Sequence, residues 1–185
     1  MRALKSTVTL LFAAFAVMAA ALLPASASGH TKETFKFEEY FLGKTVAYGK
    51  FWAINGTRRT FRVDLRGTWN GKTLKLVEDF AYDDGVNERK IWYFTKTGPG
   101  RYVGKRDDVE GVANVRIRGN TARYGYKLYL DAENRSNLVR LRDRMVLKDD
   151  GNVRNTATVF KLGLPVGRVV VNFARPESIK NLKRP

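Results

Sequence analysis

The sequence predicts an all-β protein, an up-and-down antiparallel β-barrel of about eight to ten strands. Turn signals recur at an even pitch, because Asn55-Gly56, Asn70-Gly71, Asp84-Gly85 and Pro99-Gly100 place their glycines 15, 14 and 15 residues apart. The segments between these turns are rich in aromatic and β-branched residues, which favour strands. No amphipathic helix of useful length competes with this pattern. The chain is therefore expected to be almost entirely β.

The expected strands follow one another with short connections. In chain order they cover residues 45–54, 58–67, 73–82, 88–97, 101–108, 111–118, 122–131, 138–147, 153–161 and 166–174. Their pitch exceeds the 8–12 residues typical of sandwich strands, which favours long strands closed into a barrel, with a sandwich as the alternative. Short helices fit only at 34–41 and 176–183.

The first 27 residues have the features of an export signal. Arg2 and Lys5 form a charged start, residues 8–23 are apolar, and Ala25-Ser26-Ala27 is an A-x-A cleavage site. We expect a cleaved signal peptide at 1–27, a single barrel domain at 28–175 and a basic tail at 176–185 that frays. The chain has no cysteine, so we expect a periplasmic protein that is neither disulfide-bonded nor a lipoprotein.

The charge of the chain favours anionic partners. The formal charge is +16, and loss of Arg2 and Lys5 with the signal would leave +14. Export argues against nucleic acid, so weak association with an anionic membrane surface is the expected consequence. Outward-facing arginines would form a basic outer wall, either a solvated exterior or a site for anionic surfaces. These are Arg62, Arg66, Arg116, Arg118, Arg140, Arg142 and Arg144.

The sequence lacks the residues that several common catalytic and metal-binding sites require. His30 is the only histidine and lies close to the expected cleavage point, and cysteine is absent. The usual zinc sites, Ser-His-Asp triads and cysteine nucleophiles therefore have no ligands or bases in the folded domain. We expect no metal, no cofactor and no assigned catalytic residue.

Two carboxylates fall on the apolar faces of expected strands. Glu78 alternates with Leu76 and Phe80, and Asp143 lies two residues from Leu141. Since residues alternate faces along a strand, both acids should point inward. An isolated buried carboxylate costs several kcal/mol, so each acid needs a partner.

Four side chains are candidate partners of these acids: Arg89, Tyr126, Asn155 and Lys161. Asn155 and Lys161 share the apolar face of strand 153–161. Which face of strand 88–97 points inward is ambiguous, because Trp92 and Phe94 lie on the face opposite Arg89. Together with Glu78 and Asp143, these residues form the expected ligand-binding set. The cluster is interpreted either as an internal network that sets strand register or as a site for a ligand's head group, and acid–base chemistry is a third interpretation.

An ordered series of motifs runs through the chain, including Tyr40-Phe41-Leu42-Gly43, Glu78-Asp79-Phe80, Tyr82-Asp83-Asp84-Gly85, Arg89-Lys90-Ile91-Trp92, Asp107-Asp108-Val109-Glu110-Gly111, Asp143-Arg144-Met145 and Lys161-Leu162-Gly163. Over residues 36–175 this series resembles the bacterial family catalogued as domain of unknown function 3833. The resemblance implies an exported, calycin-like β-barrel similar in architecture to lipocalins, with no established activity.

We expect a monomer that holds a lipid or other small apolar ligand in an aromatic lumen, with Glu78 and Asp143 near its polar end. A binding protein is favoured over an enzyme. Two alternatives stay open: an enzyme of the isomerase or hydratase type acting on such a ligand, and an envelope-associated protein that binds anionic surfaces.

Overall fold

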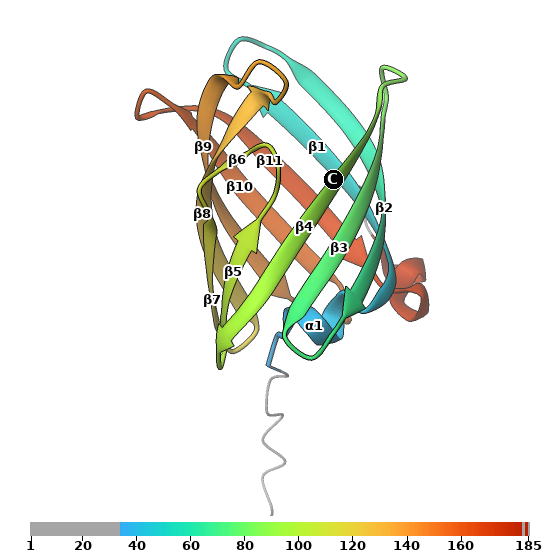
Figure 1. Ribbon diagram of the computed structural model, residues 1–185. Helices are drawn as coiled ribbons and strands as arrows, with labels where there is room; N and C mark the ends of the chain where they lie inside the picture. The colour runs from blue at the N-terminus through green and yellow to red at the C-terminus, as the bar shows by residue number, and fades with distance from the viewer. Residues whose placement is uncertain (1–33, 183, 185) are drawn as a thin grey trace, which may run out of the picture. The chain divides into compact units, whose positions relative to one another are not determined.

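Ten antiparallel strands form a closed barrel in the computed structural model, which describes residues 34–182 and 184 (Figure 1). Each strand pairs with its neighbours in the order β1-β2-β3-β4-β5-β7-β8-β9-β10-β11, and the pairing of β1 with β11 closes the ring. The two-residue strand β6 adds to the edge of β8. The barrel prediction is therefore confirmed. The expected signal peptide at 1–27 and His30 lie outside the described residues.

The elements follow the expected order closely. They are α1 (Phe37–Tyr40), β1 (Gly43–Ala53), β2 (Arg58–Trp69), β3 (Thr73–Tyr82), β4 (Asn87–Gly98), β5 (Arg101–Lys105), β6 (Val109–Glu110), β7 (Ala113–Arg118), β8 (Thr121–Asp131), β9 (Ser136–Leu147), β10 (Val153–Lys161), β11 (Leu164–Ala174) and the 3₁₀ helix η1 (Pro176–Asn181).

The largest departure from the expected strands lies between β5 and β7. The strand expected at 101–108 ends at Lys105, because the chain turns there and the amide of Val109 donates to the carbonyl of Arg106 at 3.0 Å. Strand β6 then pairs with β8 beside Leu128. This turn carries Arg106 and Asp108 into the barrel, which matters for the site described below.

Strand alternation places the core inside the barrel. In β9, Val139, Leu141, Asp143 and Met145 are buried while the intervening arginines are exposed. The same period of two runs through β2, β7 and β10. The interior of the barrel is therefore the core, as expected from the sequence.

Helix α1 and the residues beside it close one end of the barrel (Figure 1). The rings of Phe35, Phe37, Tyr40 and Phe41 are buried in the barrel. The Phe37 ring stacks on Tyr102 with centroids 5.3 Å apart, and the Tyr40 hydroxyl donates to the carbonyl of Phe173 at 3.0 Å. We call residues 35–41 the plug.

Polar contacts also attach the plug to the wall. Glu38 accepts hydrogen bonds from Lys96, at 2.5 Å, and from the Tyr102 hydroxyl. Burial opposes the charge of Glu38, but these two bonds lower its pKa below the usual value. The plug is therefore held both by aromatic packing and by an ionised carboxylate.

The C-terminal tail was expected to fray, but it folds against the barrel. It forms η1, buries Ser178, and places the Arg184 guanidinium 4.7 Å from the centroid of the Tyr48 ring. Packing of η1 beside β1 and β11 supplies contacts that the basic composition of the tail did not indicate. Within the described residues, no helix is both long enough and apolar enough to cross a bilayer.

Substitution of Gly67 by alanine should loosen the plug. A Cβ at Gly67 would lie 1.8 Å from the carbonyl oxygen of Phe41, so the plug backbone would have to move. We expect Gly67→Ala to lower the free energy of unfolding by about 1–3 kcal/mol in urea titrations. Gly98→Ala is the matched control, because a Cβ there has no atom within 4 Å. Equal stability of the two variants would contradict this account of the plug.

Candidate functional site

A cavity of about 630 Å³ occupies the end of the barrel opposite the plug. It reaches the β1–β2 hairpin at Ile54 and the end of β8 at Leu130. Its walls are mostly apolar side chains from strands around the barrel: Phe51, Phe61, Phe80, Tyr126, Leu128, Val139, Leu141, Val159, Val166 and Val169. A cavity of this size and lining is typical of a site for one small ligand.

Four cationic side chains interrupt this apolar lining. They are Arg59, Lys90, Arg106 and Lys161, and the cavity lining contains no aspartate or glutamate. The carboxylates that pair with these cations stand outside the lining. Asp84 pairs with Arg59, and Asp108 pairs with both Lys90 and Arg106. A ligand in the cavity therefore meets the cations without meeting their partners.

Arg106 lies at the centre of the polar contacts, with only 10% of its side chain exposed. Its Nε and Nη2 donate to the two oxygens of Asp108 at 2.5 and 3.1 Å, an arrangement that fixes the plane of the guanidinium. The guanidinium carbon lies 4.6 Å from the centroid of the Trp92 ring. Nη1 is 3.9 Å from the Glu78 carboxylate, beyond hydrogen-bond distance.

Lys90 extends this network toward the cavity mouth. Its Nζ lies 3.1 Å from Asp108 and 3.3 Å from Glu88, and Glu88 also accepts a hydrogen bond from the Tyr82 hydroxyl at 3.3 Å. Burial raises the pKa of Asp108, but the charges of Arg106 and Lys90 outweigh it and hold the pKa below the usual value. Asp108 is therefore the ionised anchor of both cations.

Glu78 points inward as expected, yet it does not line the large cavity. It borders a space of about 40 Å³ beside the plug, together with Trp92 and Tyr124. Burial raises the pKa of Glu78 to about 7, because the nearby charge of Arg106 only partly compensates for lost hydration. Near neutral pH this carboxyl is divided between its protonated and ionised forms.

Asp143 also points inward and lies outside the large cavity. It accepts one hydrogen bond, from the side-chain amide of Asn155 at 2.7 Å. Its second oxygen, Oδ2, has no partner within the described residues. Burial raises the pKa of Asp143 to about 7 in spite of the Asn155 hydrogen bond.

Two stacked tyrosines lie next to these groups: Tyr126 lines the large cavity, and Tyr124 borders the small space beside Glu78. The rings of Tyr124 and Tyr126 are 6.1 Å apart and nearly parallel, and Tyr126 meets Trp92 edge-on at 5.3 Å. Burial, and after it the Asp143 carboxyl, raises the pKa of both phenols well above the usual value. Both hydroxyls are therefore neutral hydrogen-bonding groups, and that of Tyr124 donates to the sulfur of Met145 at 3.4 Å.

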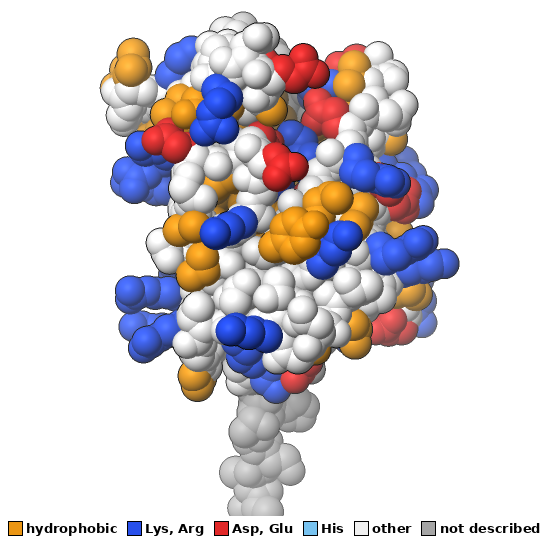
Figure 2. Space-filling view, in the orientation of Figure 1, with side chains coloured by type: hydrophobic (Ala, Val, Ile, Leu, Met, Phe, Trp, Pro, Cys, Tyr) orange, Lys and Arg blue, Asp and Glu red, His pale blue; other side chains and the backbone are white. Residues whose placement is uncertain are grey.

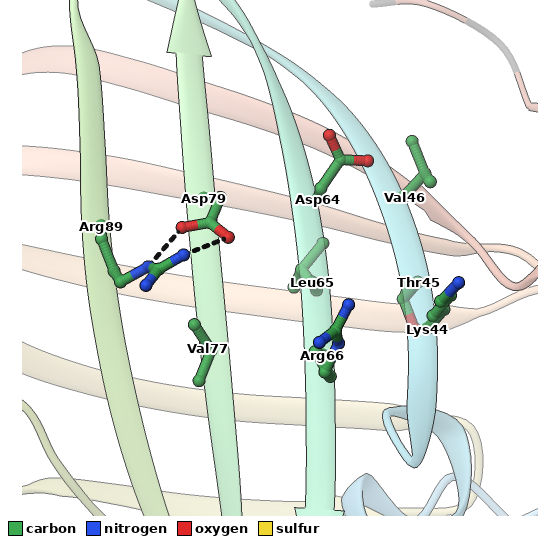
Figure 3. A pocket seen from close by; sticks show the side chains of 9 residues that line it. All are labelled: Lys44, Thr45, Val46, Asp64, Leu65, Arg66, Val77, Asp79 and Arg89. Atoms are coloured by element: carbon green, nitrogen blue, oxygen red, sulfur yellow. Dashed lines mark hydrogen bonds and ion pairs between the residues drawn. The ribbon is translucent and has the colours of Figure 1, made fainter.

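Arg89 does not belong to the lumen, which corrects one of the candidate assignments. It lies on the outer wall, where its Nε and Nη2 donate to Asp79 at 2.6 and 3.0 Å (Figure 3). Trp92 and Phe94 are buried inside the barrel, and a period of two then turns Arg89 outward and Lys90 inward.

Lys161 does not pair with either acid. Its side chain lies at the cavity mouth and donates to the side-chain oxygen of Asn137 at 3.3 Å. Strand β10 ends at this residue, so Lys161 is at the rim whereas Asp143 and Asn155 lie deeper. Of the six expected site residues, Tyr126 and Lys161 line the cavity, and Glu78, Asp143 and Asn155 lie inside the barrel beyond its lining.

Sequence reasoning missed Arg106, Asp108 and Lys90, although strand alternation carried the signal. Arg106 and Asp108 continue the face of buried Tyr102 through the expected strand at 101–108. Lys90 is two residues from buried Trp92. Within the described residues, no group of three or more His, Cys, Asp or Glu side chains is placed to hold a metal ion.

The closed antiparallel barrel with a cavity open at one end has a calycin-like fold, and solved structures share this fold. The S-type phycobiliprotein lyase CPES from Guillardia theta is 10% identical, with a TM-score of 0.55 over 75% of this chain and 90% of that one. Rv2717c from M. tuberculosis is 12% identical, with a TM-score of 0.51 over 77% of this chain and 99% of that one. At these identities the likeness concerns the fold alone.

The chain belongs to the family described as protein of unknown function DUF3833, whose family model matches residues 14–175. The resemblance inferred from the motifs is thereby confirmed. No curated protein matches the chain.

Replacing Asp143 by asparagine should stabilise the protein at high pH. The pKa of Asp143 rises from 3.8 to about 7 on folding, so the folded state keeps a proton that the unfolded chain loses. Stability should therefore fall as pH rises from about 4 to 7 and stay reduced above that range. We expect Asp143→Asn to gain about 2–4 kcal/mol over the wild type at pH 8, and the gain to shrink toward pH 4.

Chemical denaturation across this pH range measures the effect. Asp79→Asn is the matched control, because it removes the same charge from an exposed acid whose pKa is lowered by Arg89. The free energy of unfolding of the Asp79→Asn control should not exceed that of the wild type at pH 8. A difference between Asp143→Asn and the wild type that does not vary with pH would refute the assignment of Asp143 as a protonated core group.

Proposed function

We propose that the protein binds one small apolar ligand with an acidic head group in the lumen of its barrel. The observation that carries this proposal is the cavity of about 630 Å³, whose lining combines aromatic and aliphatic walls with four cations and no carboxylate. Apolar walls contribute affinity in proportion to the ligand surface they bury. The cations select the head group, because a buried anion needs charged donors.

Arg106 is the proposed anchor of the head group. Asp108 and Trp92 already hold its guanidinium in place, so little side-chain freedom is lost when an anion binds. Its Nη1 nitrogen makes no contact with Glu78 shorter than 3.9 Å, which leaves N–H donors for a ligand oxygen. Protonation of Glu78, whose pKa is about 7, would leave the Arg106 charge less compensated and favour an anion further.

The geometry favours binding over turnover. The acid–base chemistry expected from the sequence requires the carboxyl group of Glu78 or Asp143 within hydrogen-bond reach of the ligand. Glu78 and Asp143, the two acids expected for such chemistry, are both absent from the cavity lining. We therefore prefer a carrier or binding protein to an isomerase or hydratase.

Titration with a fluorescent fatty acid tests the proposal. We expect cis-parinaric acid to bind with a stoichiometry of one, and its methyl ester to bind at least tenfold more weakly because the ester lacks the charge. Val159→Trp, which fills the cavity wall, should abolish both signals, whereas Thr158→Trp on the outer face of the same strand should not. The proposal fails if neither probe binds and native mass spectrometry of the gently isolated protein finds no small molecule.

The role of Arg106 is testable by a conservative change. Arg106→Lys keeps the charge but removes the planar fork, so the affinity for the fatty acid should fall by about 10–100-fold, as for loss of a charged hydrogen bond. Affinity for the methyl ester should change little. Arg89→Lys is the matched control, since Arg89 makes the same fork to an aspartate on the outer wall. An equal loss for acid and ester would show that Arg106 shapes the cavity without selecting the head group.

A further inference from the structure

Arginines face one another directly on the outer surface of β7, β8 and β9. Arg116 lies opposite Arg123, and Arg123 lies opposite Arg144. Like charges in such positions destabilise a sheet. All three side chains are exposed, and none of them forms an ion pair within the described part of the chain. The stability of the barrel therefore does not explain this row.

The row borders a surface groove of about 490 Å³. Arg118, Arg140 and Arg142 join Arg116 and Arg123 in its lining, and the buried Asp143 is the one acidic residue there. Gly125 also belongs to the lining, and because it has no side chain the groove stays open over the carbonyl of Leu141, 3.2 Å from where a Cβ would stand. We call this surface the arginine wall.

An exposed apolar tip adjoins the arginine wall. A neighbouring depression shares Arg140 and Arg142 with the groove and adds Leu138, Phe160 and Leu162. Leu162 is 96% exposed at the turn between β10 and β11. Figure 2 shows Lys and Arg side chains along the edge of the molecule where β7 to β9 run, below a hydrophobic tip.

The backbone conformation of Leu162 is also unfavourable for a leucine, so the stability of the fold does not explain this residue. Leu162 has a φ of 51°, in the left-handed region, which is unfavourable for a residue that carries a Cβ. An exposed side chain recovers none of that cost by packing. A glycine or asparagine would suit the turn better, so the presence of leucine points to a partner outside the chain.

We propose that the arginine wall and the Leu162 tip dock on a bilayer surface that contains anionic phospholipid. Arginine binds phosphate groups through its fork of donors, and an anionic surface attracts basic residues within a Debye length. An apolar side chain beside such cations inserts at the boundary between head groups and acyl chains. A free anion or a nucleic acid would use the arginines but would leave Leu162 in water.

Docking in this orientation also brings the cavity mouth near the lipid. Lys161 precedes Leu162 and lines the lumen cavity. The proposal does not depend on a lumen ligand, however, because the wall and the tip lie on the outside of the barrel. The cavity-filling Val159→Trp variant should therefore dock as well as the wild type.

Vesicle co-sedimentation of the purified protein tests the proposal. We expect binding to vesicles of phosphatidylcholine with one-quarter phosphatidylglycerol, little binding to phosphatidylcholine alone, and at least a tenfold loss of affinity between 50 and 500 mM NaCl. The double variant Arg123→Gln with Arg140→Gln should weaken binding at least tenfold at low salt. Its fold should survive, since removal of Arg123 relieves the repulsion from Arg116 and Arg144.

Two further variants separate docking from general charge. Lys44→Gln with Arg66→Gln removes the same charge from the outer face of β1 and β2, where the two residues lie opposite each other, and should bind like the wild type. Leu162→Ser should weaken binding to vesicles about threefold or more without changing binding of soluble glycerophosphoglycerol. If the variant with Lys44→Gln and Arg66→Gln lost as much vesicle affinity as the variant with Arg123→Gln and Arg140→Gln, the proposal would be overturned, because general charge would explain the binding. If Leu162→Ser did not change vesicle binding, the proposal would also be overturned, and only a site for free phosphate groups would remain.

Discussion

The buried guanidinium of Arg106 divides the interior of the barrel into two parts. Taking this charge out of water is costly, and the cost is offset by the two hydrogen bonds that Arg106 donates to Asp108 and by the face of the Trp92 ring. On the plug side of Arg106 the lumen is filled by aromatic rings, with Phe37 stacked on Tyr102 and Trp92 on Phe94. On the other side it is open. The cavity and the cationic side chains at its inner end both depend on how Arg106 is held.

The plug and the cavity are complementary consequences of closing a ten-stranded barrel. A barrel of this size encloses more space than its own strands fill, so one end needs extra side chains to form a core. Residues 35–41 supply them at one end. At the other end no segment of the described chain enters the lumen in this way, and the apolar walls border a cavity. The packed core is thus concentrated near the plug and the cavity lies near the mouth.

Charge has different surroundings inside and outside the barrel. Inside, Glu78 and Asp143 hold raised pKa values because burial outweighs their few polar contacts. Outside, the arginines of β7 to β9 are exposed to water, Asp143 is the one acidic residue in the groove that they line, and the exposed Leu162 stands beside them. The two buried acids therefore tie the stability of the fold to pH, whereas the stability of the fold does not explain the row of arginines.

Much of the fold followed from local pattern. The strand expected at 73–82 and the strand at 153–161 have the observed bounds, because turn glycines and alternation define them without knowledge of distant contacts. Inward Asp143 was likewise readable from its apolar neighbours in β9. Arg89 was misjudged because Arg89 and Trp92 lie on opposite faces, and only the buried Trp92 showed which face is inside.

By itself, the sequence determined the all-β class, the order of the strands, the inward position of both acids and the basic outer face. Only the tertiary structure decided that Arg106 pairs with Asp108 and lies 3.9 Å from Glu78, and that both acids lie outside the cavity lining. It also decided that Arg116, Arg123 and Arg144 form a row. The physical reason is that alternation reports which face a side chain takes, whereas its partners depend on strand register and on the turn at 106–109. Those are set by packing across the whole barrel.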